Sequence, residues 1–226
     1  MFERERPASS PVRSRLRLLA IADLALLSPD RLVEQVTAAV LGGATAIQLR
    51  GKKSSAGELL AAADRLRAAS PLADIPLFMN DRVDLAAIAG FRGVHLGDED
   101  LAVADARKLL GPEAWIGRTA RNPETARMAA SDGADYLGVG SVFGGGSKPE
   151  VPVIGIEGMA TVVQASPLPV VAIGGITAER AGACIAAGAA GVAVIGALFF
   201  GDPAPRVVQA RAAALRAAVE AGSEER

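Results

Sequence analysis

Charged side chains suited to phosphate chemistry follow several short apolar segments of this 226-residue chain. Arg50 and Lys52 come just after one such segment, and Lys148 follows a later one. Arginine binds phosphate oxygens as a two-pronged donor, and lysine binds them as a point charge. Asp81 and Asp100 follow two neighbouring segments, and Mg²⁺ binds through one or two carboxylates together with substrate phosphates. These residue types favour a site that binds a diphosphate with the help of Mg²⁺.

Two apolar runs near the end of the chain each lead through glycine toward a helix. The first, 167–173, ends at Gly174-Gly175, and the second, 188–195, ends at Gly196. Glycine lets backbone N–H groups approach an anion, and the following helix N-terminus adds a favourable dipole. Because βα barrels build a phosphate site from the turns after strands 7 and 8, we expect these turns to bind a phosphate.

Eight apolar segments alternate with helical segments, and no shift in composition marks a second domain. Continuous apolar runs of this length are typical of strands buried on both faces of a parallel sheet. The alternation predicts an α/β fold, a single (βα)8 TIM barrel over 16–221, with a flexible tail over 1–15. The predicted strands are 16–23, 44–49, 76–79, 93–96, 114–117 and 134–138, followed by the two glycine-ended runs. In such barrels the active site lies where strands lead into helices, and the charged residues fall at those points.

Composition excludes several classes of function. A net charge of −1 and a pI near 5.9 give no electrostatic reason to bind nucleic acid or an anionic membrane. Charged residues interrupt each apolar run before it reaches the length of a membrane span. Cys184 is the only cysteine, which favours a buried structural thiol in a reducing, cytoplasmic setting. The oligomeric state is left open, with a homo-oligomer as one option.

The single histidine limits the chemistry further. His95 is the only residue of its type, which excludes a metal site made of several histidines. It lies between Val94 and Leu96 in a predicted strand, and this position favours a packed structural role. With no evident nucleophile, the site is expected to bind and stabilise charge rather than attack a substrate.

Five motifs resemble the thiamine-phosphate synthase family in order and spacing, over about residues 16–200. They are the segments IQLRGK (47–52), NDRVDLA (80–86), GVHLGDED (93–100), ADYLGVG (134–140) and IGGI (173–176). Linked motifs are far more specific than a single glycine turn. The resemblance implies a (βα)8 enzyme that joins 4-amino-5-hydroxymethyl-2-methylpyrimidine diphosphate to a thiazole phosphate and releases pyrophosphate.

The resemblance also implies roles for individual residues. Arg50, Lys52 and Lys148 would be catalytic, and Asp81 and Asp100 would hold Mg²⁺. The residues implied to contact the two small-molecule substrates are Gln48, Leu49, Arg50, Gly51, Lys52, Asn80, Thr119, Gly145, Gly146, Ser147, Lys148, Gly175, Ile195 and Gly196. The family chemistry is dissociative: pyrophosphate leaves first, and the thiazole nitrogen captures a pyrimidine-methyl cation. Stabilising the leaving group is then the main task, which fits a site without a nucleophile.

Three positions depart from the family pattern. Asp98 replaces a common glutamine and is expected to add a carboxylate near the metal. The segment 145–148 reads Gly-Gly-Ser-Lys where the family has Thr-x-Thr-Lys, and Gly196 replaces a serine. The last two departures affect the expected thiazole-phosphate contacts more than the diphosphate side.

Three other functions stay open. The related thiazole tautomerase shares the barrel, but its catalytic histidine would fall near Arg121, where this chain has none. A non-catalytic phosphate-binding barrel would account for the altered loop 144–147. Another phosphate-sugar isomerase on the same fold is disfavoured, because the other motifs fit the synthase and a fold alone does not fix chemistry.

Overall fold

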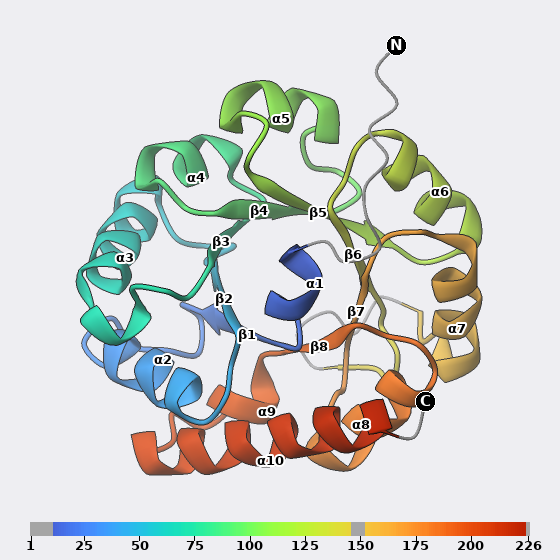
Figure 1. The fold of residues 1–226 in the computed structure, drawn as a ribbon. Coiled ribbons are helices and arrows are strands. Elements are labelled where there is room, and N and C mark those ends of the chain that lie inside the picture. The colour runs from blue at the N-terminus through green and yellow to red at the C-terminus, as the bar shows by residue number, and fades with distance from the viewer. Residues whose placement is uncertain (1–10, 146–151, 225–226) are drawn as a thin grey trace.

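The structure, a computed structural model, describes residues 11–145 and 152–224. Eight parallel strands pair in sequence order, and β1 pairs with β8 to close the barrel (Figure 1). The strands are β1 Leu18–Asp23, β2 Ala46–Arg50, β3 Leu77–Asn80, β4 Gly93–Leu96, β5 Trp115–Ala120, β6 Tyr136–Val139, β7 Val170–Ile173 and β8 Gly191–Val194. The predicted (βα)8 barrel is confirmed.

Helices surround the strands as an outer ring (Figure 1). They are α2 Leu32–Leu41, α3 Ala56–Ala68, α4 Val83–Ala89, α5 Val103–Leu110, α6 Pro123–Ser131, α7 Gly155–Ala165, α8 Ala178–Ala186, α9 Gly196–Phe199 and α10 Pro205–Glu224, with a 3₁₀ turn, η1, at Ser70–Leu72. Within the described residues, no helix combines the length and apolar character needed to cross a membrane.

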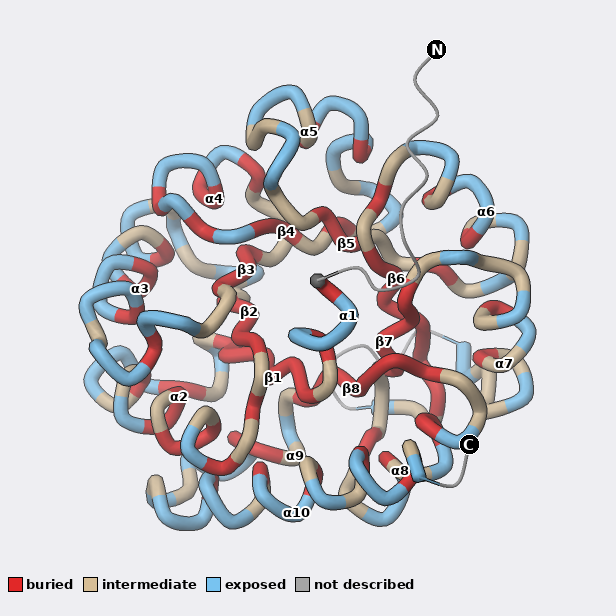
Figure 2. The backbone as a smooth tube through the Cα atoms, in the orientation of Figure 1, coloured by how far each residue is buried: buried red, intermediate tan, exposed pale blue. Residues whose placement is uncertain are grey.

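Strand alternation divides the core into two layers. Outward-facing residues such as Leu49 and Val94 pack under the helices. Inward-facing residues such as Leu19, Phe78 and Tyr136 fill the barrel interior, and Figure 2 shows most of the strand residues as buried. This is the arrangement that continuous apolar strand sequences favour.

A short helix, α1 (Pro11–Arg15), closes the amino-terminal end of the barrel and lies across its centre (Figure 1). Val12 and Leu16 are fully buried and pack with the barrel interior. The prediction of a flexible tail is therefore wrong for residues 11–15, because the open end of the barrel presents apolar side chains that these two residues cover. Residues 1–10 lie outside the described part of the chain.

Candidate active site at the carboxyl ends of the strands

A cavity of about 920 Å³ opens at the carboxyl ends of the strands and extends into the barrel. Its lining comes from most of the strand ends and the turns that follow them, as expected for this fold. The predicted site residues that line it are Gln48, Arg50, Gly51, Lys52, Asn80, Asp81, Thr119, Gly145, Gly175, Ile195 and Gly196. The structure thus brings together most of the residues that the sequence selected.

Two predicted residues in the described part of the chain, Leu49 and Asp100, are not part of the cavity lining. Leu49 does not face the cavity: its side chain is fully buried under the helices, because alternation along β2 turns it away from Gln48 and Arg50. Asp100 lies beside the cavity, in contact with Asp81, rather than in its lining. The predicted residues Gly146, Ser147 and Lys148 lie outside the described residues.

Arg50 is held by a carboxylate that the sequence did not single out. Asp23 ends β1 in register with Arg50 at the end of β2, and its Oδ2 accepts a hydrogen bond from Nη1 of Arg50. Asp23 is only 3% exposed, and its Oδ1 accepts a bond from the backbone N–H of Ala25 at 3.1 Å. A charged pair fixed in this way points the guanidinium across the cavity mouth.

Lys52 and Asp81 form an ion pair at the mouth, with 2.5 Å between Nζ and Oδ2. Asp81 adopts a left-handed backbone conformation, with φ of 63°, and its N–H donates to the carbonyl of His95 at 2.9 Å. A residue other than glycine rarely adopts this conformation unless its surroundings hold it there, and such strain is concentrated at functional sites. The strained turn places the Asp81 carboxylate beside the lysine.

Asp100 completes a pair of carboxylates with Asp81. Its Oδ2 accepts a hydrogen bond from the N–H of Gly97 at 2.6 Å. Burial raises the pKa of Asp100, and the contact with Asp81 adds to this, while the Gly97 N–H and Lys52 oppose it. Two carboxylates whose charges disfavour one another are stabilised by a cation between them.

These groups fit a divalent metal. Among the described residues no cluster of three or more histidine, cysteine, aspartate or glutamate side chains could hold an ion. Asp81 and Asp100 would supply two carboxylates, which is the number that Mg²⁺ commonly takes from a protein when substrate phosphates supply the rest. The contact between the two carboxylates is the observation that favours a cation here, and the raised pKa of Asp100 agrees with it.

The deep end of the cavity is built around His95 and Tyr136. Nε2 of His95 lies 3.2 Å from Oγ1 of Thr119. The imidazole packs against the Tyr136 ring, with 5.6 Å between the two ring centroids. A Cβ at Gly138 would lie 2.6 Å from the imidazole, and a Cβ at Gly117 would lie 2.2 Å from the tyrosine ring. Glycine is required at both positions so that these rings can lie across the barrel.

The structure therefore corrects the expectation for His95, which lines the cavity as well as packing inside the barrel. Tyr136 also lines the cavity, and its fully buried hydroxyl has no hydrogen-bond partner among the described residues. Burial raises the pKa of Tyr136 far above its ordinary value, so the hydroxyl stays protonated. The deep end thus offers a hydroxyl and an imidazole to the polar edge of a flat ring.

The predicted phosphate turn lies on the opposite side of the mouth. Gly174 and Gly175 both have positive φ, and a Cβ at Gly175 would lie 2.0 Å from the carbonyl oxygen of Gly144. The turns after β6 and β7 are therefore in direct backbone contact, which only glycine allows. Arg180 donates to the carbonyl of Gly175 at 2.9 Å and brings a further cation to this side.

Asp98 does not join the carboxylate pair. Its Oδ2 accepts a hydrogen bond from Nη1 of Arg121 in an ion pair at the rim. The expectation that Asp98 adds a carboxylate near the metal is corrected by this contact, because the arginine balances its charge. Arg121 stands where the related tautomerase would have its catalytic histidine, and it is engaged in this ion pair.

Sequence reasoning missed Asp23, Tyr136, Arg180 and the cavity role of His95. Asp23 is the last residue of an apolar strand, and a charge at that position could have indicated a site residue. Its partner Arg50, however, is 27 positions away in the sequence. Tyr136 is the only tyrosine and interrupts an aliphatic strand. Arg180 lies in the first turn of α8, which nothing in the chain distinguishes from a solvated helix face.

Comparisons with known proteins identify the family of the chain. The profile of the family described as thiamine monophosphate synthase matches residues 18–198. The thiamine-phosphate synthase of Anaeromyxobacter dehalogenans is 48% identical over 192 residues, which cover 84% of each chain. That of Haloarcula marismortui is 44% identical over 204 residues, covering 88% of this chain and 94% of the relative.

A solved structure shows the same similarity in fold. The thiamine phosphate pyrophosphorylase of Pyrococcus furiosus superposes with a TM-score of 0.83 at 37% identity, covering 94% of this chain and 99% of that one. A match along this length, in sequence and in fold, leaves one conclusion: the chain belongs to the thiamine monophosphate synthase family.

Proposed function

We propose that the cavity joins a pyrimidine diphosphate, 4-amino-5-hydroxymethyl-2-methylpyrimidine diphosphate, to a thiazole phosphate, giving thiamine phosphate and pyrophosphate. One observation carries the proposal: the cations Arg50 and Lys52 meet the Asp81–Asp100 carboxylate pair on one side of a mouth whose other side is the Gly174-Gly175 turn. A site with one end suited to a metal-bound diphosphate and the other to a phosphate fits two phosphorylated substrates.

The diphosphate is proposed to lie against Arg50 and Lys52, with Lys148 as a third cation by family resemblance. Asp81 and Asp100 would hold Mg²⁺, which when bound would neutralise the charge of the departing pyrophosphate. Asn80 and Gln48 line the cavity close to these groups and would orient the substrate. Fixed charges aimed at a leaving group lower the barrier because they need not reorganise during the reaction.

The pyrimidine ring is proposed to enter the deep end, beside His95, Thr119 and Tyr136. Once the bond to pyrophosphate breaks, a pyrimidine-methyl cation would form there. The protonated Tyr136 hydroxyl and the half-buried imidazole, whose Nε2 lies against Thr119, would offer polar contacts to the ring there. The wall of Ile173, Ala193 and Ile195 would keep water from it.

The thiazole phosphate is proposed to bind at the glycine turns. Gly175 and the first N–H groups of α9, at Gly196 and Ala197, would contact its oxygens, since the first turn of a helix leaves N–H groups without intrahelical partners. Arg180 lies beside Gly175 and adds charge. This places the thiazole nitrogen on the side of the mouth from which it can capture the cation.

The proposed setting is the cytoplasm, on the ground that the chain has a single cysteine and that it is buried. The choice of Mg²⁺ over other divalent ions rests on the two oxygen ligands and the phosphate chemistry.

The experiment is to mix both substrates with Mg²⁺ and measure thiamine phosphate and pyrophosphate together. We expect the two products in equal amounts, and no reaction when either substrate is omitted. Formation of neither product by folded protein would refute the synthase assignment and favour a non-catalytic phosphate-binding barrel.

A tautomerase activity is the second candidate, and a specific contact weighs against it. Arg121 is held in an ion pair with Asp98, and arginine side chains do not serve as proton shuttles, so this position cannot perform the proton transfer that isomerisation of the thiazole requires. Isomerisation of the thiazole phosphate at an enzymatic rate, without coupling to the pyrimidine, would reverse this ranking.

A further inference from the structure

One side of the cavity mouth is apolar, in contrast to the charged side that follows β2 and β3. Because β1 and β8 pair with one another, the segments that follow these two strands are neighbours. Leu24 and Leu26 come from the segment after β1, and Ala197 and Phe200 come from the segment after β8. All four line the cavity, and together they are called the apolar lip.

Phe200 is the unusual member of the apolar lip. It is 72% exposed, the highest value among the large apolar residues that the structure describes. Single exposed apolar side chains are common on protein surfaces. Of the exposed large apolar residues in the described part of the chain, however, Phe200 is the one that lines the cavity. A flat ligand that packs against this ring would remove it from water, and such burial stabilises a complex.

The backbone that carries Phe200 is held in place. The N–H of Phe200 donates to the carbonyl of Gly196 at 3.1 Å, which completes the short helix α9. From α10, Nη1 of Arg211 donates to the carbonyl of Leu198 at 3.0 Å and to that of Phe200 at 3.4 Å. The ring is therefore presented from a fixed position at the mouth.

Gly196 leaves open space beside the phenylalanine. The one side-chain contact within 4 Å that a Cβ at Gly196 would make among the described residues is with the Cβ of Phe200, at 3.8 Å. The family has a serine at this position, so the space of its side chain is open here and borders Phe200. The first N–H groups of α9, which are proposed to bind the thiazole phosphate, lie at the same place. In thiamine phosphate an ethyl group joins the phosphate to the thiazole ring, which brings the ring within reach of Phe200, one helical turn from Gly196.

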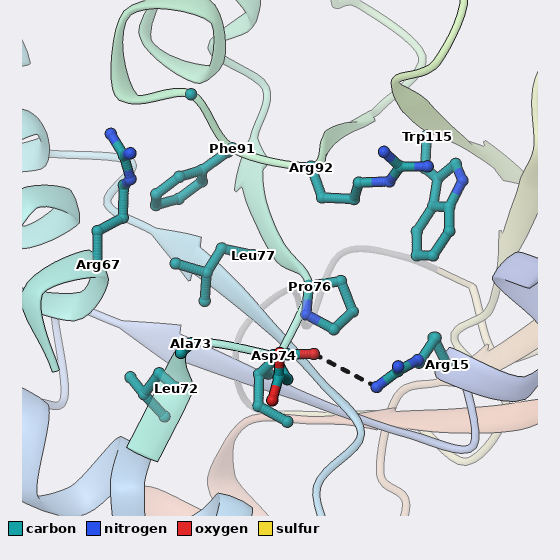
Figure 3. Close-up of a pocket in the computed structure, with 12 residues that line it drawn as sticks. Arg15, Arg67, Leu72, Ala73, Asp74, Pro76, Leu77, Phe91, Arg92 and Trp115 are labelled. Carbon is teal, nitrogen blue, oxygen red and sulfur yellow. Dashed lines mark hydrogen bonds between the residues drawn. The ribbon is translucent and has the colours of Figure 1, made fainter. Parts of the chain in front are cut away.

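A second pocket, at the amino-terminal ends of the strands, has no comparable apolar surface (Figure 3). Its volume is about 530 Å³, and its apolar side chains Leu72, Leu77 and Phe91 are at most 8% exposed. The guanidinium of Arg92 lies over the Trp115 ring, 4.5 Å from its centre. An exposed apolar ring beside a proposed phosphate site is thus a feature of the mouth and not of this pocket.

We propose that Phe200 contacts the thiazole ring of the second substrate and selects for an aromatic ring at this side of the mouth. The inference rests on the proposed function, because it takes the thiazole phosphate as the ligand. The glycine turns and the start of α9 hold the phosphate, and the apolar lip holds the ring. This apolar contact offsets the hydroxyl contact that Gly196 cannot make. Phe200 therefore acts in binding and specificity, and not in the departure of pyrophosphate.

The experiment measures binding without turnover. Isothermal titration calorimetry compares the thiazole phosphate with ethyl phosphate, which has the phosphate and the linker but no ring, in the presence of Mg²⁺ and pyrophosphate. Phe200→Ala should weaken binding of the thiazole phosphate about tenfold and leave binding of ethyl phosphate unchanged. Phe200→Tyr keeps an aromatic ring and should bind both ligands as the unchanged protein does. Leu109→Ala, an exposed apolar residue outside the lining, is the matched control.

Steady-state kinetics gives a second measurement. In Phe200→Ala the KM for the thiazole phosphate should rise about tenfold, with kcat and the KM for the pyrimidine diphosphate nearly unchanged, because the lost contact is made equally before and during the reaction. Thermal unfolding should be nearly the same in Phe200→Ala and the unchanged protein, since the side chain is exposed when the site is empty.

Equal affinity of Phe200→Ala and the unchanged protein for the thiazole phosphate would overturn the inference, and the synthase assignment would stand if both products still form. An equal loss of affinity for both ligands would also overturn it, because Phe200 would then act through the position of α9 and not through the ring. An unchanged protein that binds neither ligand and forms no product would refute the proposed function, and the inference with it.

Discussion

Asp23 and Arg50 form a buried ion pair between the ends of β1 and β2, and the pair fixes a cation at the mouth of the cavity. The side chains are 5% and 14% exposed, respectively. Neither residue can move independently, because a buried charge that loses its partner is costly. The pair therefore connects the first strand of the barrel, in which the sequence predicted no site residue, to the proposed diphosphate site.

Asp23→Asn should weaken diphosphate binding, because Arg50 loses the charge that orients it. We expect the KM for the pyrimidine diphosphate to rise about tenfold or more, with the KM for the thiazole phosphate nearly unchanged. Steady-state kinetics with each substrate varied in turn measures both constants. Asp202→Asn is the matched control, since it breaks an Arg–Asp pair with Arg31 outside the cavity. An equal rise in both constants would indicate general loss of structure instead.

Asp100→Asn should stabilise the metal-free protein at neutral pH. The pKa of Asp100 is raised in the folded state by burial and by Asp81, so the folded state holds this proton more tightly than the unfolded state. The free energy of unfolding then falls as the pH rises from the ordinary value of 3.8 through the raised value.

Removing this charge should raise Tm by about 1 to 4 °C at pH 7. The gain should shrink as the pH falls toward the ordinary carboxyl value, where both states are protonated. Thermal unfolding in the presence of a chelator measures it. A variant that is less stable than the unchanged protein at pH 7 would show that Asp100 is not a strained carboxylate.

Helix α1, which closes the amino-terminal end of the barrel, should contribute to stability and not to turnover. Val12 is fully buried against the barrel interior, so Val12→Ala should lower the free energy of unfolding by about 1 to 3 kcal/mol. Urea unfolding measures the loss, and Arg13→Ala, exposed on the same helix, is the control. Equal stability of the two variants would mean that the helix does not close the barrel in solution.

Cys184 should be inert to alkylation in the folded protein. Burial raises the pKa of this thiol to about 11, so the reactive thiolate is scarce at pH 8. Iodoacetamide followed by mass spectrometry should find the residue unmodified at pH 8 and modified in urea. Because the unfolded thiol ionises near 9.0, stability should also fall as the pH rises from 9.0 toward 11, and Cys184→Ala should remove this contribution. Rapid modification without denaturant would contradict the buried position.

The barrel and much of the mouth could be predicted because both follow from local patterns. Apolar strands that alternate with helices predict the barrel, and the rule that active sites follow strand ends places Arg50, Lys52 and Asp81 together. The family was likewise predicted from linked motifs, and the match of the family profile to residues 18–198 confirms it. The side chain of Leu49 was wrongly expected to face the cavity. Side chains alternate along a strand, so Leu49 faces outward because its neighbours Gln48 and Arg50 face inward.

The rest depends on contacts between distant segments, which spacing does not reveal. The Asp23–Arg50 and Asp98–Arg121 pairs each join two strand ends, and only the closed barrel sets which charges meet. The helix at Pro11–Arg15 is short and rich in arginine, so its role becomes visible only against the open end that it covers. The position of His95 in the cavity likewise depends on the closed barrel, because its sequence neighbours Val94 and Leu96 indicate only a buried strand.

The most direct test of the central claim is pyrophosphate release measured against Mg²⁺ concentration, with both substrates present. The unchanged protein should show a saturable dependence on Mg²⁺, while Asp81→Asn and Asp100→Asn should each lose about 100-fold or more in turnover. Asp98→Asn, a carboxylate of the same region that pairs with Arg121, should retain most of its activity. Turnover that is independent of Mg²⁺, or that both variants keep at low Mg²⁺, would contradict the assignment of Asp81 and Asp100 as the metal site.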